Sequence, residues 1–297
     1  MGKSAATTTG YEMPDLLRGR CVELSGRRLF VREGGPSDAP VLVLLHGLGA
    51  NADLNWFTAY PMLTARFRVI APDLPGHGRS DVAVDRFVLA DAATDIAELM
   101  RVLGVRRLVA VGYSMGGVVA QLLWRDHREL VDGLVLAATS RNFRGDPRER
   151  MLFALYPAAS FFVRAASPEV AHAVGRLFGA PGARTRWREW IRREVARTSP
   201  RVTMQAACEL AAFSSHDWAS QIDVPTAVIC STRDKLIPAR RQRRLADAIP
   251  GAVRFDVDGD HFACTERPDL FLPALDAACR FAVGDGFCDA GRQRPAA

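Results

Sequence analysis

Short apolar runs alternate along this chain with segments of helical periodicity, and this alternation restricts the fold more than any other feature. Val41–Leu45 is an unbroken apolar run, which is typical of a strand buried on both faces of a sheet. Similar strands are predicted at residues 68–72, 108–112, 134–138 and 226–231. Because strands that alternate with helices form parallel sheets covered on both faces, the sequence predicts an α/β fold with a mostly parallel sheet.

The helices predicted between these strands have apolar residues at helical spacing. Ile96, Leu99, Met100 and Leu103 recur at i, i+3, i+4 and i+7, and Gly104 follows as a stop signal. Further helices are predicted at residues 115–127, 239–249 and 269–281. Residues 20–24 and 29–32 predict an antiparallel hairpin. Residues 253–257 alternate between apolar and charged, which predicts a strand near an edge of the sheet.

The alternation stops between about residues 141 and 217. This segment is rich in arginine, alanine and aromatic residues and contains no strand-like run. We expect a helical cap at 141–217, inserted into a core domain formed by residues 1–140 and 218–297. Its aromatic side chains would either contact an apolar substrate or form the cap's own core, and the sequence leaves both interpretations open.

Residues 112–116 read Gly-Tyr-Ser-Met-Gly, directly after one predicted strand and directly before a helix. In that context the G-x-S-x-G pattern predicts a nucleophile elbow, a sharp turn that exposes the hydroxyl of Ser114. The alternative is an ordinary tight turn, which small residues also permit. A serine hydroxyl is a weak nucleophile, so a catalytic role for Ser114 requires a neighbouring base that an acid orients.

His261 and Asp234 are the predicted base and acid. In the chain order Ser…Asp…His the base lies in a loop after the last strand, where His261 stands. Asp234 closes the segment after the strand at residues 226–231. Asp258 and Asp260 are competitors, but carboxylates so near in sequence seldom point at the histidine ring. We therefore predict a catalytic triad of Ser114, Asp234 and His261.

The predicted oxyanion hole consists of two backbone N–H groups, those of Leu48 and Met115. Met115 begins the helix after Ser114, and Leu48 lies in the His-Gly-Leu-Gly segment that follows Val41–Leu45. Four further residues are expected to support these loops: His46, Gly47, Gly49 and His77.

These motifs together resemble the α/β-hydrolase fold family over roughly residues 20–283. The motifs are HGLG at 46–49, DLPGHGRS at 73–80, GYSMGG at 112–117, the strand-end Asp234 and GDHF at 259–262. The resemblance implies an eight-stranded sheet with an inserted cap at about 141–217. The sequence departs from many relatives at Asp260, where they carry a small residue, and has HGLG in place of HGGG. Serine at position 114 argues against dehalogenase and epoxide hydrolase chemistry, which uses aspartate.

The predicted function is hydrolysis of a carboxylic ester or lactone of a small to medium apolar substrate through an acyl-serine intermediate. This chemistry uses no metal and no organic cofactor. The same triad also serves carbon–carbon bond hydrolases, thioesterases and acyltransferases, which the sequence does not separate. A ligand receptor with little turnover on the same fold is the alternative from another class.

Composition limits the partners. The net charge is +6, but 37 of the 39 basic residues are arginine, the others being Lys3 and Lys235, which indicates codon bias rather than phosphate contacts. The cluster at 240–244 lacks interleaved aromatics, so no nucleic-acid partner is expected. No apolar stretch approaches the roughly 20 residues of a membrane span. With no secretory signal and six scattered cysteines, the expected location is the cytoplasm, with no stable membrane anchor.

Overall fold

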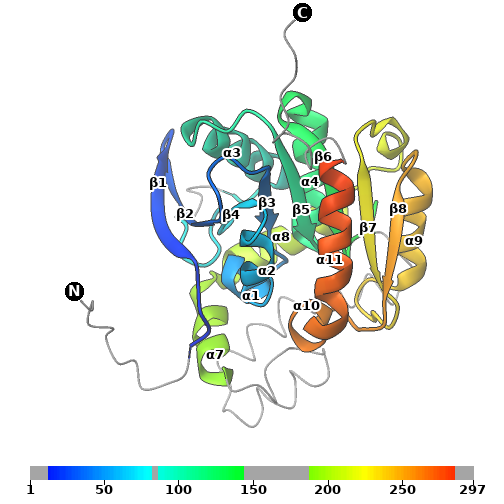
Figure 1. Ribbon diagram of the computed structural model, residues 1–297. Coiled ribbons are helices and arrows are strands. Elements are labelled where there is room, and N and C mark those ends of the chain that lie inside the picture. Colours follow the sequence, from blue (N-terminus) through cyan, green and yellow to red (C-terminus); the bar gives the residue numbers. More distant parts are fainter. Residues whose placement is uncertain (1–12, 82–85, 144–186, 285–297) are drawn as a thin grey trace, which may run out of the picture.

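A computed structural model describes residues 13–81, 86–143 and 187–284, and its centre is an eight-stranded sheet with helices on both faces (Figure 1). The strands are β1 (Arg18–Leu24), β2 (Arg27–Gly34), β3 (Val41–Leu45), β4 (Arg68–Pro72), β5 (Leu108–Tyr113), β6 (Val131–Ala137), β7 (Thr226–Ser231) and β8 (Val253–Val257). Their order is β1-β2-β4-β3-β5-β6-β7-β8. Only the β1–β2 and β2–β4 pairs are antiparallel, so the predicted mostly parallel sheet is confirmed.

The helices of the described residues include every helix that the sequence predicted outside the insertion. The α-helices are α1 (Ala52–Trp56), α2 (Tyr60–Thr64), α3 (Leu89–Val102), α4 (Met115–Asp126), α7 (Arg188–Arg197), α8 (Pro200–Ala212), α9 (Ala239–Ala248), α10 (Ala263–Glu266) and α11 (Pro268–Val283). Two short 3₁₀ helices are η1 (Arg128–Leu130) and η2 (Ala219–Gln221). The sequence did not predict α1, α2 or α10, because four or five residues are too few to show a helical period.

Two hydrophobic cores lie on opposite faces of the sheet. In β3, Val43 and Leu45 belong to the core under α3, α4, α8 and α9. Leu42 and Leu44 point the other way, into the core under α1, α2, α7 and α11. Since side chains alternate along a strand, a strand covered on both faces must be apolar at every position. This explains the unbroken apolar run from which the fold was predicted.

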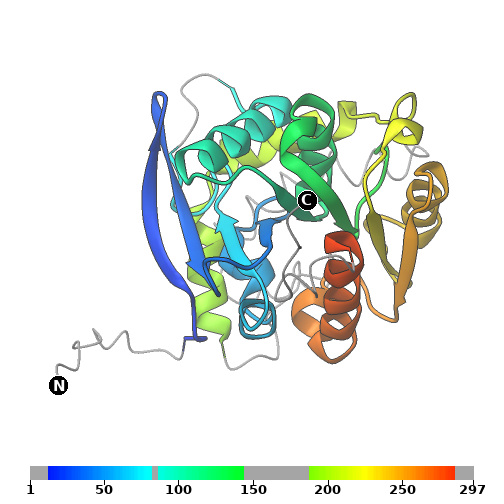
Figure 2. The ribbon, with the colours of Figure 1, turned by 45° about the horizontal axis from the view of Figure 1, so that its top comes forward.

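The ends of the sheet differ from its centre. Figure 2 shows the β1–β2 hairpin along one margin and β8, with α9 beside it, along the other. Val253 of β8 is 36% exposed, and the prediction of an edge strand is confirmed. β6 begins at Val131, three residues before the predicted start at Leu134. Gly133 interrupts the apolar pattern there, and a Cβ at that position would collide with the Ala282 carbonyl of α11.

The predicted insertion, residues 141–217, lies between β6 and β7 in the chain and is called the inserted segment below. Its described part contains α7 and α8, which contact α1 and α3 respectively. Trp187 and Trp190 pack edge-to-face on Phe57, with ring centroids 4.9 and 5.2 Å apart, so these two aromatics join the core. Further aromatic residues of the segment, at 153, 156, 161 and 162, lie outside the described residues. No helix in the described ranges has both the length and the apolar character needed to cross a membrane.

Candidate active site

Ser114 stands at a strained turn between β5 and α4. Its φ of 53° and ψ of −113° lie in a region that non-glycine residues rarely occupy. The glycines on both sides are required by space: a Cβ at Gly112 would collide with the Gly116 backbone, and one at Gly116 with the Leu45 carbonyl. The close approach of β3, β5 and α4 therefore explains why small residues surround this serine.

Three side chains predicted to react together are in hydrogen-bond contact. His261 Nδ1 lies 2.7 Å from Asp234 Oδ2, and His261 Nε2 lies 3.0 Å from Ser114 Oγ. The side chain of Asp234 is fully buried and that of His261 is 12% exposed. Ser114, Asp234 and His261 follow β5, β7 and β8, so the parallel sheet brings them to one edge. A carboxylate at Nδ1 favours the tautomer whose Nε2 accepts the serine proton.

Asp234 is fixed by bonds to both of its oxygens. Oδ1 accepts the N–H groups of Leu236 and Ile237, each at 2.8 Å. Oδ2 accepts Gln242 Nε2 at 3.0 Å as well as the histidine. The sequence analysis did not identify Gln242, because it stands within the arginine-rich cluster at 240–244. Its spacing of three from Leu245 was the signal that it belongs to the buried face of α9.

The two competing carboxylates have other partners. Asp258 forms an ion pair with Arg233 at 2.7 Å. Asp260 accepts the backbone N–H of Phe262 at 2.8 Å. The preference for Asp234 as the histidine's partner therefore agrees with the geometry.

The loop after β3 lies against Ser114 and is held by buried polar groups. A Cβ at Gly47 would lie 3.5 Å from the Ser114 Cβ. The Gly47 N–H donates to Asn55 Oδ1 at 2.7 Å. His46 Nε2 accepts the N–H of Leu74 at 2.9 Å, so its Nδ1 carries the proton and donates to the Gly47 carbonyl at 2.9 Å. Complete burial lowers the pKa of His46 to about 3, so the ring is neutral and can accept at Nε2 while it donates from Nδ1.

Two backbone N–H groups beside Ser114 have no acceptor within the described residues, those of Leu48 and Met115. Met115 is the first residue of α4, and the first N–H groups of a helix have no acceptor inside it. Gly49 adopts a φ of 68° in the turn after Leu48. The structure thus places both predicted oxyanion donors in the two segments that meet at the serine.

His77 lies in the neighbouring loop and is fully buried. Its Nδ1 is 3.1 Å from the Pro75 carbonyl, and its ring centroid is 5.1 Å from that of His46. These contacts are within its own loop and with His46, in keeping with a loop-supporting position.

Tyr113 makes a contact with His261 that the sequence did not predict. Its buried hydroxyl donates to the His261 carbonyl oxygen at 2.7 Å, and its ring lies edge-on to the imidazole at 5.9 Å. Burial raises the pKa of Tyr113 well above its usual value, so the hydroxyl stays protonated and can donate. The variable position of G-x-S-x-G gives no signal for such a bond.

A mainly apolar pocket opens onto these groups. Its lining residues are Gly47, Leu48, Ala50, Asn55, Tyr113, Ser114, Leu210, Leu236, Ile237, His261 and Phe262. Leu210 comes from α8, so the inserted segment contributes to the pocket wall. Within the described ranges, no group of three or more His, Cys, Asp or Glu side chains is arranged to hold a metal ion.

Comparison with known proteins agrees with this geometry. Residues 40–268 match the family model described as alpha/beta hydrolase fold. The chain is 30% identical to the pimeloyl-[acyl-carrier protein] methyl ester esterase of Chromobacterium violaceum, over 83% of this chain and 96% of the esterase. It is also 30% identical to the magnesium-chelatase 30 kDa subunit of Rhodobacter capsulatus, over 78% of this chain and 84% of that protein.

A solved structure shows the same fold. The enol-lactonase from Burkholderia xenovorans LB400 superposes with a TM-score of 0.73 at 25% identity, covering 87% of this chain and 98% of the lactonase. The family match spans most of the chain and includes β3 to β8 together with Ser114, Asp234 and His261. The protein is therefore a member of the alpha/beta hydrolase fold family.

Proposed function

We propose that this protein is a serine hydrolase that cleaves a carboxylic ester or lactone of a small to medium apolar substrate. One observation carries the proposal: Ser114 Oγ, His261 and Asp234 form a continuous relay, with contacts of 3.0 and 2.7 Å, at an apolar pocket. Acyl transfer requires a nucleophile, a base that contacts it and an acid that orients the base, connected in this order.

The proposed reaction proceeds in two halves. Ser114 Oγ attacks the substrate carbonyl carbon while His261 Nε2 accepts the hydroxyl proton. The carbonyl oxygen becomes an oxyanion that the N–H groups of Leu48 and Met115 stabilise. The C–O bond to the leaving group then breaks, and His261 returns the proton to the departing alkoxide. Water attacks the acyl-serine in the same way and releases the carboxylic acid and free Ser114.

The pocket supports an apolar acyl or alcohol group. Leu210, Leu236, Ile237 and Phe262 contribute side chains to its wall, and the family relatives include a methyl ester esterase and an enol-lactonase. We extend the proposal to the domains: residues 1–140 and 218–297 form the hydrolase core, and 141–217 form a cap over the site. The position of Leu210 in the pocket and the place of α8 between β6 and β7 support this division.

Hydrolysis of p-nitrophenyl esters of graded acyl length tests the proposal. We expect turnover by the wild type and a loss of at least about a thousandfold in Ser114→Ala, with no change in melting temperature. Thioesters, lactones and vinylogous diketones in the same assay distinguish the alternative bond types. The absence of turnover with every substrate would favour the receptor alternative. The similarity to a protein named as a chelatase subunit is a second reason to test that alternative.

A further inference from the structure

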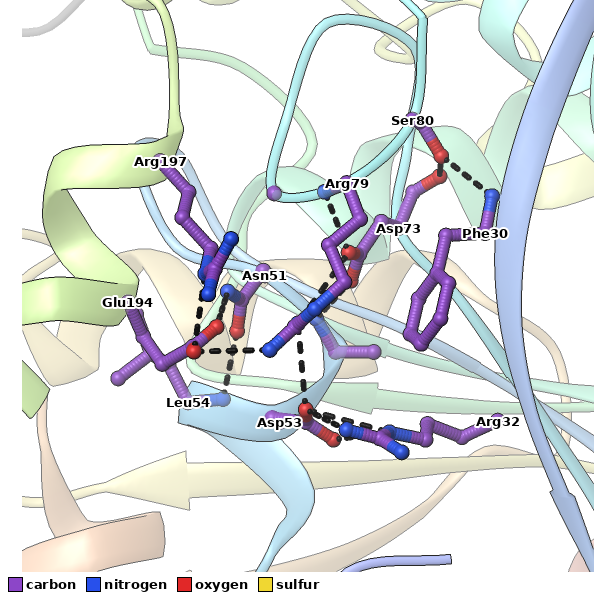
Figure 3. A network of polar contacts seen from close by, with 12 residues as sticks. Phe30, Arg32, Asn51, Asp53, Leu54, Asp73, Arg79, Ser80, Glu194 and Arg197 are labelled. Carbon is purple, nitrogen blue, oxygen red and sulfur yellow. Dashed lines mark hydrogen bonds and ion pairs between the residues drawn. The ribbon is translucent and has the colours of Figure 1, made fainter. Parts of the chain in front are cut away.

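A cluster of charged side chains surrounds Asn51, which ends the loop after β3 (Figure 3). This charged cluster consists of Arg32, Asp53, Asp73, Arg79, Glu194 and Arg197. Arg32, Asp53, Asp73 and Arg79 belong to the core, whereas Glu194 and Arg197 lie on α7 in the inserted segment. The cluster therefore joins the insertion to the core through charges rather than through apolar packing alone.

Glu194 is the member of the charged cluster that reaches across from α7. Its side chain is only 3% exposed. Oε1 accepts Arg79 Nη2 at 2.8 Å and Arg197 Nε at 3.0 Å, and Oε2 accepts Asn51 Nδ2 at 2.8 Å. Burying a carboxylate is costly unless it is paired and hydrogen-bonded, so these contacts fix Glu194 in place.

Asn51 carries this contact into the Leu48 loop. It is the N-cap of α1: its Oδ1 accepts the Leu54 N–H at 2.9 Å, while its Nδ2 donates to Glu194. The two bonds use opposite ends of one amide, so Glu194 fixes which way the Asn51 side chain faces. Just beyond α7, Thr198 Oγ1 donates to the Ala50 carbonyl at 3.3 Å. Two groups from the inserted segment thus hold the last two residues of the loop.

The other end of the loop is held by the core. His46 donates to the Gly47 carbonyl, and Asn55 accepts the Gly47 N–H. Leu48 and Gly49 lie between these two anchors. The direction of the Leu48 N–H therefore depends on both the core anchor and the anchor from α7.

We propose that Glu194 is a positioning residue for the oxyanion hole: through Asn51 it holds the Leu48 N–H in place when α7 is docked on the core. This inference rests on the proposed serine hydrolase function. It makes the inserted segment part of the catalytic geometry as well as of the pocket wall. Displacing a catalytic group by about 1 Å costs up to about a hundredfold in rate, so we expect losses of about 10- to 100-fold without Glu194.

The test uses two variants that break the same contact from opposite sides. In Glu194→Gln the amide oxygen is favoured at the Oε1 site, which accepts from Arg79 and Arg197, so an NH₂ group faces the Asn51 donor. Asn51→Ser leaves all the ion pairs and a capping oxygen for α1 but removes the donor to Glu194. Glu189→Gln is the matched control, because Glu189 lies on the same helix with 39% of its side chain exposed and pairs only with Arg192 and Arg193 within the described residues.

Kinetics with a p-nitrophenyl ester and inhibition by an arylboronic acid are then measured for each variant. The boronate forms a tetrahedral anion on the nucleophilic serine, so its affinity reports the oxyanion hole. Both variants should lose about 10-fold or more in kcat and in boronate affinity, with KM within about twofold. The double variant should lose little more than either single one, and Glu189→Gln should match the wild type.

Two results would overturn the inference. One is wild-type kcat and boronate affinity in both variants at a temperature where they remain folded. The other is a rise in KM with kcat unchanged, which would place Glu194 in substrate binding. Failure of the proposed function is distinguishable, since the wild type itself would then neither hydrolyse the ester nor bind the boronate.

Discussion

Replacing Asp234 with asparagine should disable catalysis while leaving the fold intact, and the structure indicates how. The Oδ1 site accepts two backbone N–H groups, from Leu236 and Ile237. The asparagine carbonyl oxygen is favoured at that site, because an NH₂ group there would face two backbone donors, whereas at the Oδ2 site it faces one, Gln242 Nε2. The NH₂ group then occupies the Oδ2 site and faces His261 Nδ1, 2.7 Å away in the wild type.

In that arrangement the histidine must present a lone pair at Nδ1 and carry its proton on Nε2. Nε2 then faces Ser114 as a donor and cannot act as a base. In a triad this tautomer change costs about 10⁴-fold in kcat, equivalent to about 5.5 kcal/mol of transition-state stabilisation. The measurement is kcat for a p-nitrophenyl ester, with the melting temperature as a check on folding.

Asp260→Asn is the matched control for Asp234→Asn. Asp260 accepts the Phe262 N–H and does not touch the imidazole, so this variant should keep most of the wild-type kcat. The reasoning is refuted if Asp234→Asn stays within about tenfold of wild type. It is equally refuted if the two variants lose activity to the same extent.

Three further predictions concern the surroundings of the triad. Gly116→Ala should destabilise the protein by about 3 kcal/mol or more in urea unfolding, because its Cβ would collide with the Leu45 carbonyl, whereas Gly47→Ala should be tolerated. Tyr113→Phe should lower kcat about tenfold with KM unchanged, since it removes the bond to the His261 carbonyl; an unchanged kcat would show that this bond does not position the base. His46→Gln should have a lower free energy of unfolding than the wild type at pH 8, and this difference should shrink by about 2 kcal/mol between pH 8 and pH 5. A difference that stays constant with pH would contradict the prediction. The reason is that the pKa of His46 is lowered to about 3, so between pH 6.5 and 3 only the unfolded wild type binds the proton, and acid destabilises it.

The fold could be predicted from the sequence because its signals are local. An apolar run such as Val41–Leu45 results directly from burial on both faces, and Gly104 stops α3 with a φ of 69° that favours glycine. The number of strands came from the family resemblance, and their order in the sheet was not predicted. The short helices α1 and α2 were missed because five residues carry no detectable period.

The candidate site was likewise predicted only in part from the sequence. Ser114, Asp234 and His261 each follow a strand, and parallel topology brings such positions together. The groups that hold them do not follow from spacing: Gln242 reaches Asp234 from α9, and Tyr113 reaches the His261 carbonyl across the site. The role of Glu194 was not predicted either, since it contacts Asn51, which is 143 positions away in the chain. Such contacts depend on packing between helices, which a single sequence does not encode as a pattern.

The central claim is that Ser114 forms a covalent intermediate, and mass spectrometry of a fluorophosphonate adduct tests it most directly. The wild type should gain one phosphonyl group, and peptide mapping should place it on Ser114. Ser114→Ala should gain none, and Asp234→Asn should react far more slowly, because His261 can no longer activate the serine. An unlabelled wild type, or label on another serine such as Ser80 or Ser231, would contradict the account.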